Sequence, residues 1–176
     1  MTPDKLAKSG TEHAHQVALF AWCAVAYLHG FEIAEAWAVD GPQAFKKSPR
    51  ASNPDAPPAV PALEWFHAVP NGGSRGDDEQ SRKIRGANLK AEGVRQGVAD
   101  TFLPWPNAGW HGLYIEMKKP TERPKREGKG GVSDEQSKFG AYAKSVGYGW
   151  IVCYDWREAA NALRSYIEWG TNHAND

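Results

Sequence analysis

Hydrophobic and polar residues follow one another along this chain in patterns that predict both helices and strands. Apolar residues dominate 12–28 at helical spacing, and Thr11 before them is a residue type that caps helices. The second half of this segment is apolar on most of its surface, which predicts a largely buried helix that ends at Gly30. Short apolar runs that fit strands follow at 65–69, 98–103, 112–119 and 150–154.

Three further helices are expected, at 79–91, 133–145 and 155–169. Gly93 is placed to end the first of these helices. Ser133 and Gln136 have the spacing of a capping box at the start of the second. Strands interleaved with helices predict an α/β domain, a three-layer αβα architecture with a central mixed β-sheet.

The length of the chain fits one domain with two short ends. Its 176 residues, 41% of them hydrophobic, are enough to bury one sizeable core. Residues 1–10 are interpreted as a flexible polar arm, 11–170 as the domain and 171–176 as a C-terminal tail. Six of the twelve prolines fall within 41–61, which predicts an excursion with little regular structure.

Composition narrows the compartment and the partners. Cys23 and Cys153 lie in apolar segments, which predicts buried reduced thiols in a cytoplasmic protein of a bacterial cell or phage-infected host. The N-terminus lacks the layout of a signal peptide, and the longest apolar run is too short to span a bilayer, so no membrane partner is expected. The formal net charge is zero, so composition alone does not indicate nucleic acid.

The strand expected at 112–119 has two chemically different faces. Side chains alternate along a strand, so its apolar residues Leu113, Ile115 and Met117 point one way, toward a core. Glu116 and Lys118 point the other way and place a carboxylate beside an ammonium group. A solvated strand face with a weak surface ion pair is the simplest interpretation of this pair.

An additional acidic residue favours a catalytic role for this pair over a plain surface ion pair. Asp100 precedes this strand by a gap long enough for a hairpin, so pairing of the two strands brings it near Glu116. Two carboxylates suit Mg²⁺, which accepts one or two such ligands together with a substrate phosphate. Lys118 would then orient a metal-bound water or stabilise the transition state, as in a metal-dependent nuclease.

An ordered series of segments resembles the VRR-NUC (virus-type replication-repair nuclease) family of the PD-(D/E)XK nuclease superfamily. The matching pieces are Glu12 with Gln16, Pro-Asn-Gly-Gly at 70–73 with Arg75, and the segments 89–93, 97–100, 115–118 and 133–136. The resemblance runs over about 11–166 and is interrupted by the proline-rich excursion. One departure is Ala99, where the family usually has a proline that shapes the backbone and supplies no ligand.

The resemblance implies a restriction-endonuclease-like fold and a DNA endonuclease that depends on Mg²⁺ or Mn²⁺. The metal ligands it implies are Asp100, Glu116 and the backbone carbonyl of Met117, with Lys118 as the catalytic lysine. Glu12 would approach from the first helix as an outer or second-metal carboxylate, and Gln136 would position the water or the substrate phosphate. Two plainer roles stay open: Gln136 as a helix cap, and Glu12 as an acid favoured by the helix dipole.

Basic residues near these motifs are candidates for DNA contacts. They are Arg75, Lys90, Arg95, Lys119, Arg123, Lys125, Arg126 and Lys129, with Arg82, Lys83 and Arg85 on the helix at 79–91 as a second surface. Solvated charge is the alternative for both groups. Trp105 and Trp110 either stack on exposed bases or pack within a hairpin or dimer contact. His13 and His15 are spaced by two, do not share a helix face, and are interpreted as surface histidines.

The substrate implied by the resemblance is branched DNA. Stand-alone members of the family resemble Holliday-junction-resolving enzymes of recombination and DNA repair, are expected to act as homodimers, and fit a phage or prophage source. A flap- or end-processing nuclease is one alternative, and a non-catalytic DNA-binding module on the same fold is another. Intact Asp100, Glu116 and Lys118 argue against the binding module.

Overall fold

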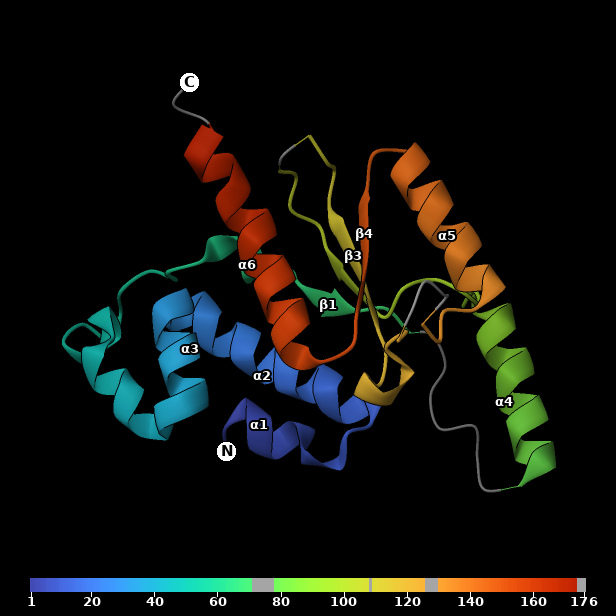
Figure 1. Cartoon of the computed structure of the whole chain (residues 1–176), viewed down its shortest axis with the longest axis horizontal. Helices are drawn as coiled ribbons and strands as arrows, with labels where there is room; N and C mark the ends of the chain where they lie inside the picture. The colour runs from blue at the N-terminus through green and yellow to red at the C-terminus, as the bar shows by residue number, and fades with distance from the viewer. Residues whose placement is uncertain (71–77, 108, 126–129, 174–176) are drawn as a thin grey trace.

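A four-stranded mixed sheet organises the protein (Figure 1). The computed structural model describes residues 1–70, 78–107, 109–125 and 130–173. The strands are β1 (His67–Ala68), β2 (Thr101–Leu103), β3 (Leu113–Met117) and β4 (Gly149–Cys153), in the spatial order β1-β2-β3-β4. The β1/β2 and β2/β3 pairs are antiparallel, whereas β3 and β4 are parallel. The expected mixed α/β sheet is therefore confirmed.

Helices precede, interrupt and follow these strands. In the described residues the α-helices are α1 (Pro3–Leu6), α2 (Glu12–His29), α3 (Phe31–Asp40), α4 (Glu79–Ala91), α5 (Asp134–Ser145) and α6 (Trp156–His173). Short 3-10 turns, η1 (Ala7–Ser9), η2 (Gly41–Lys47), η3 (Pro49–Ala51), η4 (Pro61–Leu63) and η5 (Pro120–Glu122), join them. No helix within the described ranges is both long and apolar enough to cross a membrane.

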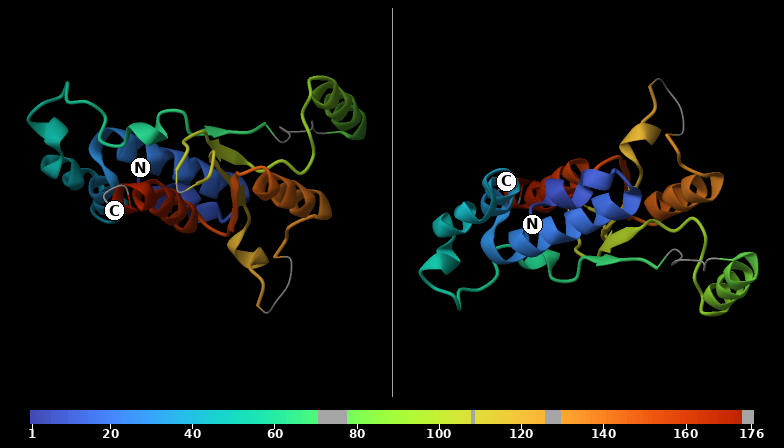
Figure 2. Two further views of the ribbon diagram at one scale, coloured as in Figure 1. Left: turned by 90° about the horizontal axis from the view of Figure 1, so that it is seen from above. Right: turned by 90° about the horizontal axis from the view of Figure 1, so that it is seen from below.

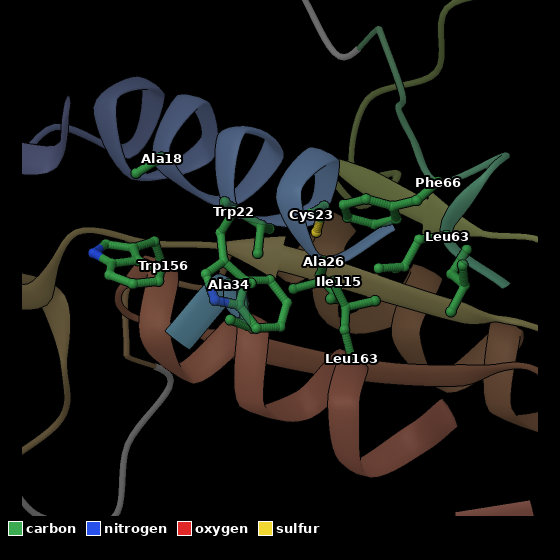
Figure 3. Close-up of a cluster of buried hydrophobic side chains, with 14 of the residues drawn as sticks. Ala18, Trp22, Cys23, Ala26, Ala34, Leu63, Phe66, Ile115, Trp156 and Leu163 are labelled. Atoms are coloured by element: carbon green, nitrogen blue, oxygen red, sulfur yellow. The ribbon is translucent and has the colours of Figure 1, made fainter. Parts of the chain in front are cut away.

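The two faces of the sheet are covered differently. Leu113, Ile115 and Met117 are buried in the main core, which lies between the sheet and the helices α2 and α6, as the alternation of β3 predicted. In Figure 3, Trp22 of α2 and Leu163 of α6 lie around Ile115, and each of these three side chains is at most 1% exposed.

Helix α5 packs on the opposite face of the sheet. The ring of Phe139 meets Tyr114 of β3 edge-on, at 5.1 Å between ring centroids. A Cβ at Gly140 would lie 2.5 Å from the indole of Trp150 in β4, so this close approach of α5 requires a glycine. The face of β3 that carries Glu116 therefore lies toward α5.

The N-terminal ten residues differ from the flexible arm that their polar composition predicts. Pro3 and Ala7 are buried, one on α1 and one on η1. Asp4 accepts a hydrogen bond from the indole N–H of Trp156, at 3.1 Å, and pairs with Arg157 at 2.6 Å. Two small apolar residues one helical turn apart are enough to dock this segment, and average polarity hides them.

The segment after α2 also contains structure that the sequence pattern did not reveal. Gly30 ends α2 as expected, with φ of 94° and its N–H bonded to the carbonyl of Ala26. The chain then enters α3 at once, and Phe31 and Ala34 of this helix join the core. The proline-rich residues 41–61 form short 3-10 turns, which the fixed φ of proline accommodates. Cys23 and Cys153 are buried free thiols, as expected.

Candidate active site

A buried glutamate at the end of β3 is the centre of the site. The side chain of Glu116 is 1% exposed, on the face of the sheet toward α5. Its Oε1 accepts hydrogen bonds from Lys118, at 2.9 Å, and from the amide of Gln136. Its Oε2 is buried and has no hydrogen-bond partner among the described residues. A buried oxygen in this state costs free energy that the protein fold alone does not recover.

Lys118 lies just past β3 and is held by both its backbone and its side chain. Its N–H donates to the carbonyl of Cys153, at 2.9 Å, which continues the pairing with β4. Its ammonium is 2.9 Å from Glu116 and 3.8 Å from Glu12. Glu12 stands in the first turn of α2, which Thr11 caps, and its side chain is 42% exposed. The structure thus brings together Glu12, Glu116 and Lys118 from two distant segments.

Asp100 lies immediately before β2, at the same end of the antiparallel β2/β3 pair as Glu116. Its Oδ2 accepts the backbone N–H of Met117, at 2.8 Å, and its own carbonyl accepts the N–H of Val69, at 2.8 Å. The N–H and C=O of one strand residue point to the same side, so the carbonyl of Met117 also points toward Asp100. Ala99 is fully buried, so the residue that replaces the family's proline packs inside the protein.

The charges in this cluster perturb one another. Burial, reinforced by the nearby charge of Asp100, raises the pKa of Glu116 to about 8, although Lys118 opposes the shift. Burial also raises the pKa of Glu12, against the opposing charge of Lys118. Burial disfavours the charged form of Lys118, but the hydrogen bond and charge of Glu116 outweigh it and raise the pKa of this lysine. The cluster therefore places three carboxyl groups around one cation, and burial keeps Glu116 in its protonated form up to a higher pH than usual.

Gln136 caps its helix, the plainer role that the sequence left open, and its side chain also contacts Glu116. Its backbone N–H bonds to Oγ of Ser133, at 3.2 Å, and its side-chain Oε1 accepts the N–H of Ser133, at 2.9 Å. These two bonds form the predicted capping box of α5. Its Nε2 donates to Glu116. The side-chain amide of Gln136 thus caps α5 through its oxygen and contacts Glu116 through its nitrogen.

Two further residues make contacts near the site that the sequence did not reveal. Gly97 has φ of 88°, and a Cβ there would lie 2.7 Å from the backbone of Glu135, so the approach to Asp100 packs directly on the first turn of α5. His15 is buried, 7% exposed, and its Nδ1 accepts the N–H of Trp156. Its interpretation as a surface histidine is wrong, because it faces the start of α6, which spacing along α2 alone could not reveal.

The candidate DNA-contacting residues are dispersed. Lys90, Arg95, Lys119 and Lys125 are exposed. Arg123 pairs with Glu158 at 2.5 Å, and its guanidinium lies 4.9 Å from the centroid of the Tyr154 ring, so it fastens the segment after β3 to the start of α6. Arg75, Arg126 and Lys129 lie outside the described residues. Trp105 and Trp110 are 43% and 37% exposed.

The donors present fit a hard cation with few protein ligands. Among the residues that the structure describes, no three His, Cys, Asp or Glu side chains form a group that could hold a metal ion. Two carboxylates and one carbonyl are nevertheless a donor set that suits Mg²⁺, which usually keeps several waters. The buried Oε2 of Glu116, which no described group satisfies, is consistent with such a ligand.

Comparison with known proteins finds similarity among solved structures. No protein-family model and no curated protein matches this sequence. A solved structure described as a VRR_NUC domain protein matches the fold with a TM-score of 0.45 at 20% sequence identity. The match covers 66% of this chain and 75% of that chain.

Proposed function

We propose that this protein is a Mg²⁺- or Mn²⁺-dependent DNA endonuclease with a restriction-endonuclease-like αβα fold. The observation that carries the proposal is the state of Glu116, whose buried Oε2 has no partner among the described residues. Two more carboxylates, Asp100 and Glu12, lie close enough to affect its pKa, and one lysine balances them. Such an arrangement is costly in a purely structural role and is the expected state of a cation-binding centre.

The proposed roles follow from the contacts of each group. Asp100, Glu116 and the Met117 carbonyl would hold the metal, which when bound neutralises charge on a phosphate and acidifies a water. Lys118 stays protonated, since its pKa is raised, and therefore acts as a donor to the developing negative charge, not as a base. Gln136 orients Glu116, and Glu12 positions the ammonium of Lys118 or serves as an outer carboxylate.

The direct test is cleavage of branched, flapped and linear DNA with and without Mg²⁺ or Mn²⁺. We expect metal-dependent cleavage by the wild type and its loss in Asp100→Ala and Lys118→Ala. Lys46→Ala is a matched control, because Lys46 is an exposed lysine on η2. Absence of metal-dependent cleavage of every substrate, or full activity of both site variants, would contradict the proposal.

We further propose, from the family resemblance, that the substrate is branched DNA and that the active species is a homodimer. Two sites facing two strands would suit a Holliday junction in recombination or repair. Preference for free ends or flaps by a monomer would favour the processing role instead. Metal-independent DNA binding without any cleavage would favour a binding module.

A further inference from the structure

Helix α4 stands apart from the rest of the protein. Figure 1 shows it beyond α5, and in both views of Figure 2 it projects from one side of the body while η5 projects from the other. In the part of the chain that the structure describes, no helix or strand makes an extensive contact with α4. Ile84 in its middle is 55% exposed, so even its apolar side is not covered.

The helix is defined at both ends by local hydrogen bonds. Asp78 caps its start by accepting the N–H of Ser81, at 2.8 Å. At its end the N–H of Val94 bonds to the carbonyl of Leu89, at 2.9 Å, and that of Gly93 to Lys90, at 3.2 Å, a Schellman motif with Gly93 at φ of 91°. The prediction that Gly93 ends this helix is thus confirmed.

Local bonds of this kind do not make α4 stable alone. It has 13 residues, and isolated helices of this length are marginal in water. Gly86 in its centre costs about 1 kcal/mol relative to alanine. Most helices in proteins are stabilised by packing of one face, which α4 lacks here. It therefore has the properties of a helix that is completed by a partner.

The charge of α4 indicates the partner. Residues 79–95 carry five basic residues against two acidic ones, whereas the whole chain has a formal net charge of zero. Lys83 and Lys90 are exposed and lie about two turns apart on one side of the helix, and exposed Arg85 lies between them along the chain. This surface is complementary to a polyanion.

The C-terminal end of α4 is anchored beside the candidate active site. Arg95 follows the helix directly, and Gly97 packs against the first turn of α5, one residue before Gln136. Asp100 follows within the same connection. The helix therefore ends near the site, and its N-terminal end lies about 20 Å farther out, given 1.5 Å per residue. A duplex in the site would extend along such a distance for several base pairs.

We infer that α4 is a DNA-backbone contact, an arm that lies along the duplex next to the scissile phosphate and gains helical stability on binding. This inference rests on the proposed nuclease function. Lys83 and Lys90, on one side of the helix, contact phosphates, and Arg85, about 200° around the helix from Lys83, adds to its positive charge. Removal of the three charges therefore weakens binding to all sequences equally. The segment that includes η5, with exposed Lys119 and Lys125, lies on the other side of the body.

The test measures binding in EDTA, so that cleavage plays no part. The triple variant Lys83→Gln, Arg85→Gln, Lys90→Gln is titrated into a fluorescein-labelled duplex and a labelled four-way junction over a range of salt concentrations. The matched control is Lys8→Gln, Lys46→Gln, Lys47→Gln, which removes the same charge from exposed residues on η1 and η2. Hydrogen exchange of the 79–91 amides with and without the duplex reports helix stabilisation.

We expect the triple variant to bind roughly tenfold more weakly or worse, and its salt slope (log Kd against log salt) to be smaller by about 3. Exchange at 79–91 should slow in the wild-type complex. Equal loss in the control variant, an unchanged salt slope, or the same exchange protection with polyglutamate would overturn the inference. If the salt slope of the triple variant changes but no metal supports cleavage, α4 contacts DNA and the nuclease proposal is wrong. If the protein cleaves DNA but the triple variant binds as tightly as the wild type, the nuclease proposal holds and the inference about α4 is wrong.

Discussion

Replacement of Glu116 by glutamine should stabilise the metal-free protein while abolishing its activity. Burial, with the charge of Asp100, raises the pKa of Glu116 from its ordinary value of 4.5 to about 8. Between these values the folded protein keeps a proton at Glu116 that the unfolded chain releases. The contribution of this residue to stability is therefore greatest at low pH and is lost as the pH rises toward 8.

The magnitude follows from this linkage. Each pH unit between the two pKa values changes the free energy of unfolding by about 1.4 kcal/mol, so Glu116 lowers it by about 2–3 kcal/mol between pH 5 and pH 7. Glu116→Gln cannot titrate and removes this slope. At pH 7 without metal we expect the variant to be more stable than the wild type. A bound divalent ion favours the ionised carboxylate and would reverse the order at a thousandfold excess over Kd, where it adds about 4.1 kcal/mol.

Urea unfolding followed by tryptophan fluorescence measures this difference at pH 5 and pH 7, in EDTA and in Mg²⁺. Glu64→Gln is the matched control, since Glu64 is exposed and the same atoms are changed. The reasoning is refuted if the wild type and Glu116→Gln show parallel pH dependence in EDTA. It is equally refuted if Glu116→Gln is the less stable protein at pH 7 without metal.

Two other substitutions separate backbone fit and helix capping from chemistry. Gly97→Ala should destabilise the fold by about 2 kcal/mol or more and lower the cleavage rate, because its Cβ would meet the backbone of Glu135 at 2.7 Å. Gly93→Ala is the control, since Gly93 has a similar positive φ but open space around it. Urea unfolding should show a smaller loss of stability for Gly93→Ala, and its cleavage activity should persist. Gln136→Ala should lose about 1 kcal/mol of stability together with most of kcat. Ser133→Ala removes the same helix cap, so it should lose comparable stability and keep its kcat. Equal kcat in the two variants would contradict the role of Gln136 at Glu116.

The sequence was most informative where local rules act. Alternation along β3 correctly predicted that Ile115 lies in the core and Glu116 on the other face. The prediction that α4 ends at Gly93 is also confirmed. Sequence reasoning failed where tertiary contacts decide. α1 was missed because single residues such as Pro3 dock it, without a periodic pattern. α3 was missed although its buried residues, Phe31, Ala34, Trp37 and Ala38, recur at helical spacing.

The candidate site shows the same division. The residues of the site could be named from spacing and resemblance, but the hydrogen bonds and ion pairs between them could not be predicted. That Gln136 serves cap and carboxylate together depends on α5 packing over β3, a relation between segments far apart in the chain. The burial of His15 likewise depends on α6.

The parallel pairing of β3 with β4 determines when, during synthesis and folding, the candidate active site is assembled. Lys118 is held by the carbonyl of Cys153, and β4 reaches its place only after α5 has crossed over. Glu12 is synthesised well before β4, but its partner lysine is not fixed until β4 has been made and paired. Contacts this distant in sequence form late in folding. A nascent chain that does not yet include β4 would therefore lack an assembled centre.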